Sequence, residues 1–161
     1  MTVTNYVFPN TKTFHAYDLN IASCDDCKVC HYKVKCQHKD DFEIVLNTLK
    51  TITHLVIVSP VYFGAFSDQL LRILNRFQLL FEAKYTHQIS VIKIPKLTLI
   101  ASAASKEDWM FDGVKLSFKL LISLFDSTEV HTLCLGNTDA LKDILKTYKT
   151  EIDNLKKSVN P

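Results

Sequence analysis

Glycine is scarce in this sequence. Its 161 residues include only three glycines, Gly64, Gly113 and Gly136, and these lie far apart. A glycine-rich phosphate loop needs two or three glycines within a few residues, so this spacing excludes both the G-x-G-x-x-G and the Walker-type nucleotide-binding motifs. A bound nucleotide would have to be held by a different kind of loop.

The sequence also lacks a strong excess of charge of one sign. Its 19 Lys and Arg residues stand against 17 Asp and Glu residues, which leaves a formal net charge of +2. Proteins that bind nucleic acid usually carry a clustered positive charge. We therefore expect no nucleic-acid partner.

Long apolar runs and targeting signals are missing as well. The longest uncharged stretch, residues 51–67, contains His54, Pro60 and Gly64 and falls short of the roughly 20 apolar residues that a membrane helix needs. The first nine residues have no Lys or Arg before their weakly apolar stretch and no small-residue cleavage site, unlike a secretion signal. We therefore expect a soluble, cytoplasmic protein with no membrane partner.

Apolar residues, in contrast, are abundant and regularly spaced. They make up 47% of a chain that has the length of one ordinary domain, so we expect a single domain over residues 1–161. Continuous apolar runs favour buried strands, and spacings of three and four favour helices. The patterns predict strands at residues 13–21, 54–59, 97–101 and 130–135, helices at residues 40–52, 67–81, 107–125 and 138–157, and an irregular connection at residues 84–95 with room for an extra short strand.

Strands and helices thus alternate along the chain. This order is typical of an α/β fold in which helices cover both faces of a parallel sheet. Ligands of such sheets bind at the carboxyl ends of the strands. The loops that follow Leu19, Ser59, Ala101 and Leu135 are therefore the places to search for a site.

The loop that follows Ser59 has an unusual composition, SPVYFGAFS. Pro60 stiffens its start, Gly64 permits a positive φ angle, and Tyr62 and Phe63 offer flat apolar surface. Backbone N–H groups near the start of the next helix can donate to electron-rich atoms. These properties suit the edge of a flavin ring, although an aromatic turn that packs on its own helix has the same composition.

Four of the five cysteines fall within 13 residues, in the pattern Cys24-x2-Cys27-x2-Cys30-x5-Cys36. Four thiolates at this spacing can surround one [4Fe–4S] cluster. Structural zinc also takes four cysteines, but usually as two separated C-x2-C pairs. Redox-active dithiols and free thiols are the remaining interpretations, since a reducing compartment disfavours disulfides. Cys134, in an apolar strand pattern, is typical of an inert core residue.

Two segments resemble a known family. Residues 59–70, SPVYFGAFSDQL, resemble the loop and following helix of the flavodoxin-like NAD(P)H-dependent FMN reductases. Residues 17–30, YDLNIASCDDCKVC, resemble the cysteine loop of the iron–sulfur flavoprotein branch of that family. The resemblance implies a flavodoxin-like three-layer sandwich with strand order 2-1-3-4-5, bound FMN and a homo-oligomer. It further implies electron transfer from NAD(P)H or a ferredoxin-type donor to a small-molecule acceptor.

The resemblance also implies which residues hold the cofactors. A [4Fe–4S] cluster would be carried by Cys24, Cys27, Cys30 and Cys36. The flavin would lie against two loops at the carboxyl ends of neighbouring strands. The contacts expected for it are Ser59, Pro60, Val61, Tyr62, Phe63, Gly64, Ser67, Ser102 and Ala103.

One unit of the family pattern is reduced or missing. In relatives, a first strand, a phosphate-binding loop and a long helix precede the segment that begins here at Thr13, and a complete βα unit takes roughly 30 residues. Residues 1–12 are too few for it, and FMN would lose the amides that neutralise its phosphate. The alternative function is therefore a shortened, non-catalytic flavodoxin-like module for binding or dimerisation, with zinc as one candidate ligand.

Overall fold

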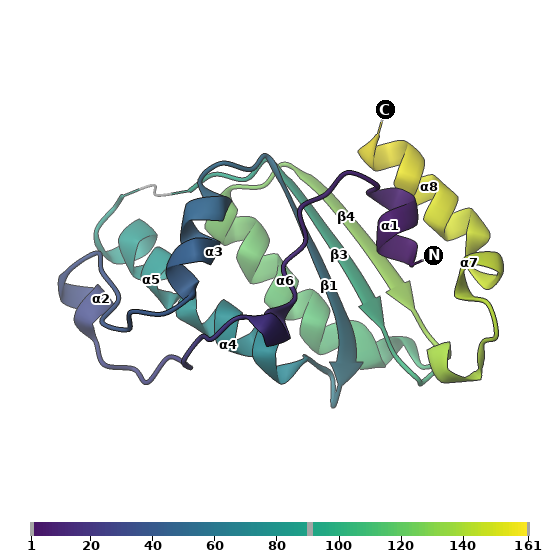
Figure 1. The fold of residues 1–161 in the computed structure, drawn as a ribbon, viewed down its shortest axis with the longest axis horizontal. Coiled ribbons are helices and arrows are strands. Elements are labelled where there is room, and N and C mark those ends of the chain that lie inside the picture. The colour runs from purple at the N-terminus through teal and green to yellow at the C-terminus, as the bar shows by residue number, and fades with distance from the viewer. Residues whose placement is uncertain (1, 90–91, 161) are drawn as a thin grey trace.

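The computed structural model describes residues 2–89 and 92–160. Its centre is a four-stranded sheet in the order β2-β1-β3-β4. Figure 1 shows β1, β3 and β4 side by side. Three of the strands are parallel, and the short β2 runs antiparallel to the end of β1. The strands are β1 (His54–Tyr62), β2 (Ala65–Phe66), β3 (Lys96–Ser102) and β4 (Glu129–Leu135).

Helices connect and cover these strands. The longer helices are α3 (Phe42–Leu49), α4 (Asp68–Arg76), α6 (Asp112–Phe125) and α8 (Lys149–Val159). The short ones are α1 (Val3–Val7), α2 (Val29–Tyr32), α5 (Gln78–Phe81) and α7 (Ile144–Thr147). Single turns of other helix types are η1 (Ala16–Asp18), η2 (Glu82–Thr86), η3 (Asp108–Phe111) and η4 (Thr138–Ala140).

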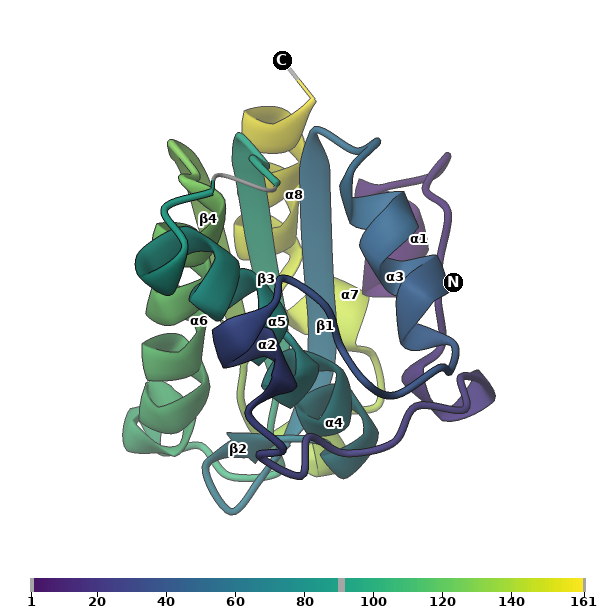
Figure 2. The same cartoon turned by 90° about the vertical axis from the view of Figure 1, so that its left-hand side faces the viewer.

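Both faces of the sheet are covered (Figure 2). On one face, α3, α4, α5 and α6 enclose a core that contains Ile57, Leu99 and Phe118. On the other face, α1 and α8 pack against Ile100 and Leu133. The result is a three-layer α/β sandwich around a mostly parallel sheet, which confirms the predicted fold class.

The register brings the carboxyl ends of the parallel strands together. Pro60 near the end of β1 pairs with Ser102 at the end of β3, which in turn pairs with Leu135 at the end of β4. The loops that follow these strands therefore leave from one edge of the sheet. A ligand at this edge could contact more than one of them.

The strands predicted at residues 54–59, 97–101 and 130–135 are confirmed. β1 runs past its predicted end at Ser59, because a proline is tolerated in an edge strand and Pro60 keeps its register with Ser102. The helices predicted at residues 40–52, 67–81 and 107–125 are present as α3, as α4 with α5, and as η3 with α6. The helix predicted at residues 138–157 is interrupted, since the Asp143 side chain caps a separate helix, α7.

The strand predicted at residues 13–21 is wrong. This segment contains only the turn η1 and pairs with no other strand. Carboxylates bind the backbone at the end of the segment instead: the N–H of Asn20 donates to Asp41 Oδ2 at 2.7 Å, and the N–H of Ala22, the residue after the segment, donates to Asp40 Oδ2 at 3.0 Å. Two acidic residues before α3 thus hold the end of this segment, where the apolar pattern predicted a strand ladder.

No strand precedes β1 within residues 2–53. The parallel strands β1, β3 and β4 follow one another in chain order, as the last three strands of a 2-1-3-4-5 sheet do. Residues 84–89 and 92–95 contain no strand, and Ser90 and Val91 lie outside the described residues. Among residues 2–89 and 92–160, no helix combines the length and the apolar character that a membrane span requires.

Candidate functional site

The predicted flavin loop is a β-hairpin. Tyr62 pairs with Ala65 across β1 and β2, which leaves Phe63 and Gly64 as a two-residue turn. Both turn residues have positive φ angles, 50° at Phe63 and 74° at Gly64, as a type I′ turn requires. Gly64 adopts the backbone conformation that was expected of it. Phe63 adopts one that bulky side chains rarely show, so the hairpin tip is strained.

Two serines of this hairpin face inward. Ser59 is 2% exposed and Ser67 is 7% exposed. The N–H of Ser67 donates to Ser59 Oγ at 3.1 Å, and the Ser59 hydroxyl donates to the Pro60 carbonyl at 2.7 Å. These bonds join the end of β1 to the start of α4. Both serines therefore position the hairpin.

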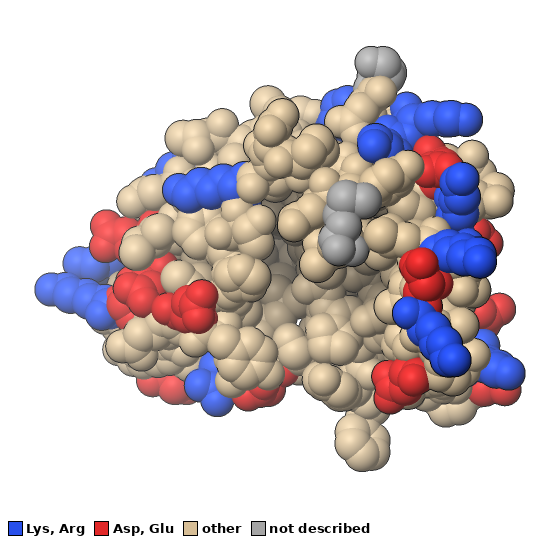
Figure 3. Space-filling view, turned by 45° about the vertical axis from the view of Figure 1, so that its right-hand side comes forward, with Lys and Arg blue, Asp and Glu red and all other residues tan. Residues whose placement is uncertain are grey.

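The outward side chains of β1 form an apolar strip. Val58, Pro60 and Tyr62 are exposed and share one side of the strand, since residues two apart point to the same face. Phe63 at the tip is fully exposed. Val56, on the same side of β1, packs in the core under α1 and α8, so the strip continues this face of the sheet. Figure 3 shows a surface that is hollowed and uncharged at its middle, with charged side chains on its two sides.

The second predicted flavin loop lies beside the first, because Ser102 is the register partner of Pro60. Ser102 is half-buried. Ala103 is buried and its N–H donates to the Leu135 carbonyl at 2.9 Å, and Val61 is buried in the core. The members of the predicted set that remain open to a ligand are Pro60, Tyr62, Phe63, Gly64 and Ser102.

Gly113, in the first turn of α6, was not among the predicted site residues. A Cβ atom at this position would overlap the carbonyl oxygen of Gly64. Two of the three glycines thus meet where the hairpin packs on α6. The scarcity of glycine in the chain is the signal that could have identified this contact.

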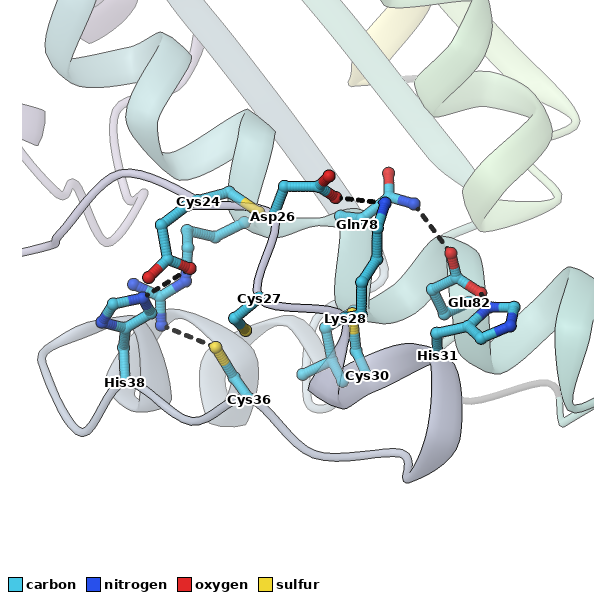
Figure 4. A pocket seen from close by; sticks show the side chains of 13 residues that line it. Cys24, Asp26, Cys27, Lys28, Cys30, His31, Cys36, His38, Gln78 and Glu82 are labelled. Carbon is cyan, nitrogen blue, oxygen red and sulfur yellow. Dashed lines mark hydrogen bonds and ion pairs between the residues drawn. The ribbon is translucent and has the colours of Figure 1, made fainter.

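The structure brings the four clustered cysteines to one pocket (Figure 4). The pocket lies between the loop that contains α2 and the segment that runs from the end of α4 through α5 to η2. Its walls therefore come from two parts of the chain that are distant in sequence. The residues that line it are Cys24, Asp25, Asp26, Cys27, Lys28, Cys30, His31, Cys36, His38, Arg76, Gln78, Leu79 and Glu82.

The thiols differ in exposure. Cys24 and Cys27 are exposed, and Cys30 and Cys36 are half-buried. Burial, together with the nearby Glu82 carboxylate, raises the pKa of Cys30. Within residues 2–89 and 92–160, no three His, Cys, Asp or Glu side chains converge on a point where a single metal ion could sit. The thiols line the pocket without meeting at its centre.

The charged groups around the thiols are largely paired. Lys28 contacts Asp26 at 2.6 Å, His38 contacts Asp25 at 3.2 Å, and His31 contacts Glu82 at 3.1 Å. Hydrogen bonds from Thr86, followed by those from His31 and Gln78, lower the pKa of Glu82. These contacts give most of the polar side chains at the rim of the pocket a partner.

Arg76, the last residue of α4, was not among the predicted site residues. Its guanidinium Nη1 donates to the Ala22 carbonyl at 2.8 Å and to Asp40 Oδ2 at 2.7 Å, and its Nη2 donates to Cys36 Sγ at 3.2 Å. Arg76 follows Ile73 by three residues, within the apolar stripe that faces the core. An arginine at such a position is the sequence signal that was available.

Both members of the Arg76–Asp40 pair, the guanidinium and the carboxylate, are charged. Burial lowers the pKa of Arg76, but the hydrogen bonds to Asp40 and the proximity of Cys36 outweigh burial and raise that pKa. Burial likewise opposes ionisation of Asp40, yet its hydrogen bonds from Arg76, Ala22 and Phe42 hold the pKa of this carboxyl below its ordinary value. A permanent guanidinium charge therefore lies beside the cysteine pocket.

No protein-family model matches the chain. Two curated proteins show local sequence similarity to it. An iron–sulfur flavoprotein of Methanocaldococcus jannaschii is 34% identical over 59 residues, which are 37% of this chain and 31% of that protein. An iron–sulfur flavoprotein of Archaeoglobus fulgidus is 32% identical over 75 residues, which are 47% of this chain and 38% of that protein. The chain thus spans about a third of the length of each of these relatives.

The fold is shared with a solved structure over nearly the whole chain. The crystal structure of an FMN-dependent NADH-azoreductase from Bacillus anthracis, in complex with FMN, superposes with a TM-score of 0.62. The superposition covers 97% of this chain and 84% of the azoreductase, at 12% sequence identity. The local sequence similarity supports the resemblance that the sequence shows to the flavodoxin-like NAD(P)H-dependent FMN reductases, and the superposition shows that the chain shares the fold of this azoreductase.

Proposed function

We propose that this chain is an FMN-dependent electron-transfer flavoprotein whose cysteine pocket carries a [4Fe–4S] cluster. In this proposal it takes electrons from NAD(P)H or a ferredoxin-type donor and delivers them to a small-molecule acceptor. The observation that carries the proposal is that all four clustered cysteines line one pocket, beside a buried arginine. The names of the two curated relatives and the FMN bound to the azoreductase support the same function.

The cysteine pocket supplies the ligand set of a four-iron cluster. Such a cluster is wider than one metal ion, so its four thiolate ligands lie around a larger body. All four clustered thiols line this one pocket. Cys24, Cys27, Cys30 and Cys36 would each ligate one iron, and the bound cluster would supply one-electron chemistry.

The hairpin suits the ring of a flavin. Tyr62 and Phe63 offer exposed aromatic surface, and Ser102 adds a hydroxyl from the neighbouring strand. Residues 2–53 contain no strand, and so no βα unit that could hold the phosphate end of FMN. The chain therefore fits the ring of FMN and leaves its phosphate without the usual amide donors. When bound, FMN would supply hydride and single-electron transfer.

Helix α4 connects the two candidate centres. It begins at Asp68, directly after the hairpin, and ends at Arg76 in the cysteine pocket. Nine helical residues span about 13 Å. One rigid element thus fixes the position of the cysteine pocket relative to the hairpin.

Metal and flavin analysis of protein purified without oxygen tests the proposal. We expect roughly four iron and four sulfide ions per chain, broad visible absorbance from the cluster, and uptake of added FMN. Cys27→Ser should abolish the iron-linked absorbance and leave FMN uptake intact. Cys134→Ser is the matched control, because Cys134 lies in β4 outside the pocket. A colourless, iron-free protein that takes up no FMN would overturn the proposal.

A second candidate is a non-catalytic binding module that holds zinc. The observation that favours it is that residues 2–53 contain no strand, and so no βα unit that could hold the phosphate of FMN. In that case the purified protein would be colourless, contain about one zinc ion per chain, and fail to bind FMN. The same metal analysis separates the two candidates.

The proposal includes a homo-oligomer. Val58 is 48% exposed on β1, an edge strand that meets only the short β2 on its outer side. Exposed apolar edges of this kind are usually covered by another chain or protected by charge. Val58→Lys should therefore shift sedimentation toward the monomer, whereas Leu120→Lys, at an exposed apolar position of α6 on the opposite face, should not. A wild-type chain that sediments as a monomer would contradict this part of the proposal.

A further inference from the structure

Of the charged residues that the structure describes, Arg76 alone is buried, with 2% of its surface exposed. Burial of an arginine costs free energy unless the guanidinium is paired and hydrogen-bonded. Asp40 provides a bidentate partner, at 2.7 Å from Nη1 and 3.3 Å from Nη2. The Phe42 ring lies 4.7 Å from the guanidinium carbon and covers one face of it.

This guanidinium closes the base of the cysteine loop. Nη1 donates to the Ala22 carbonyl just before the loop, and the Ala22 N–H donates to the Asp40 carboxylate just after it. The two ends of the loop are therefore held together by one ion pair. If this were its only role, Arg76 would need no contact with the cysteines.

Arg76 nevertheless directs one donor at a cysteine. Its Nη2 lies 3.2 Å from Cys36 Sγ, the contact marked by a dashed line at Cys36 in Figure 4. Asp40 already neutralises the guanidinium, so this bond is not required for charge balance. Its effect falls on the sulfur atom, which would ligate the cluster.

We propose that Arg76 is a positioning residue that raises the reduction potential of the cluster by donating a hydrogen bond to the Cys36 thiolate. This inference rests on the proposed [4Fe–4S] site. Reduction adds one electron to the cluster and increases the negative charge on its sulfur ligands. An N–H donor and a fixed positive charge stabilise the reduced form more than the oxidised form. Because Arg76 is buried, water screens this effect poorly.

Redox titration of the reconstituted protein tests the proposal. Arg76→Lys keeps a positive charge but loses the planar guanidinium with its paired N–H donors, and Arg76→Gln loses the positive charge as well. We expect the midpoint potential to fall in both variants, and further in Arg76→Gln. Arg72→Lys is the matched control, since Arg72 lies one turn earlier on α4 and pairs at the surface with Asp68. Cluster-loaded Arg76 variants that keep the wild-type potential would show that this arginine only clamps the loop, and would overturn the proposal.

A second measurement needs no variant that endangers folding. The chain contains only two arginines, Arg72 and Arg76, so ¹⁵N-labelled arginine places a label at one site near the cluster and one at the surface. Pulsed electron paramagnetic resonance of the reduced cluster should detect ¹⁵N coupling in the wild type and in Arg72→Lys. If the cluster is loaded but shows no ¹⁵N coupling, the proposed role of Arg76 is overturned and the proposed function is not. A wild-type chain that takes up no cluster overturns the proposed function together with it.

Discussion

The carbonyl oxygen of Gly64 occupies the space that a Cβ atom on Gly113 would need. Gly64 lies in the tip of the hairpin and Gly113 in the first turn of α6, so the contact joins the candidate flavin site to the helix that follows β3. The Ser59–Ser67 hydrogen bond holds the same hairpin from its base. The hairpin is therefore fixed at both ends before any ligand binds.

Gly113→Ala should destabilise the protein even though alanine favours helices. A glycine-to-alanine change inside a helix ordinarily stabilises by roughly 0.5–1 kcal/mol. Here the added methyl group would meet backbone atoms of Gly64, which have no rotamer to change, so the hairpin or α6 must move. We expect a net loss of about 1–3 kcal/mol in the free energy of unfolding, measured in urea, and weaker FMN binding.

Lys119→Ala is the control for the Gly113 prediction, since Lys119 is an exposed residue in the middle of α6. It should change the free energy of unfolding by less than about 0.5 kcal/mol. If Gly113→Ala stabilised the protein as a simple helix substitution does, the contact with Gly64 would have no energetic weight.

Phe63→Asn should stabilise the protein and weaken flavin binding. The φ of 50° at Phe63 costs roughly 1 kcal/mol for a bulky residue, whereas Asn followed by Gly is the preferred pair of a type I′ turn. No burial is lost, because the Phe63 side chain is fully exposed. Urea unfolding of the apoprotein and fluorescence titration with FMN measure the two effects.

Phe63→Ala separates the two roles of this residue. Alanine keeps most of the backbone strain and removes the ring, so this variant should lose FMN affinity without the gain in stability. A Phe63→Asn variant with wild-type FMN affinity would show that the ring does not contact the flavin.

The sequence was sufficient for those features that depend on neighbouring residues. The continuous apolar run at residues 97–101 predicted β3, because a strand buried on both faces needs apolar residues on both. The apolar run at residues 54–59 also predicted β1, although one face of β1 is exposed from Val58 onward. The clustering of the cysteines likewise follows from their spacing, since all four belong to one loop. Such local patterns predict these features without information about residues elsewhere in the chain.

Features that depend on distant residues were not predictable in this way. The pattern of residues 13–21 suits a strand, but the carboxylates of Asp40 and Asp41 bind the backbone N–H groups of Ala22 and Asn20, where the segment ends. The bond from Arg76 to Cys36 and the contact of Gly113 with Gly64 each join separate elements. No periodicity within a single segment encodes such pairings, so these residues of the candidate site appear only in the folded chain.

Riboflavin and FMN should bind with similar affinity. The two molecules differ by the phosphate, and residues 2–53 provide no first βα unit whose amides would hold that group. The proposed contacts of Tyr62 and Phe63 with the flavin ring would be the same for both ligands. We expect dissociation constants within about threefold of each other, a difference of roughly 0.65 kcal/mol. Isothermal titration of the apoprotein measures them, and a large preference for FMN would reveal a phosphate site elsewhere in the chain.

His54 should make the protein less stable in mild acid. Burial lowers the pKa of His54 below its ordinary value, and the nearby Lys96 lowers it further. Its Nε2 lies 2.8 Å from the buried Thr98 hydroxyl. Because the unfolded chain then binds a proton more readily than the folded one, the neutral imidazole of His54 contributes fully to the free energy of unfolding above about pH 6.5. This contribution is lost as the pH falls below that value.

His54→Gln should flatten the fall in the free energy of unfolding between about pH 7.5 and 5.5. His15→Gln, at an exposed position, should leave the slope of unfolding free energy against pH as it is in the wild type. Equal slopes in the wild type and His54→Gln would show that burial of this imidazole does not oppose its protonation.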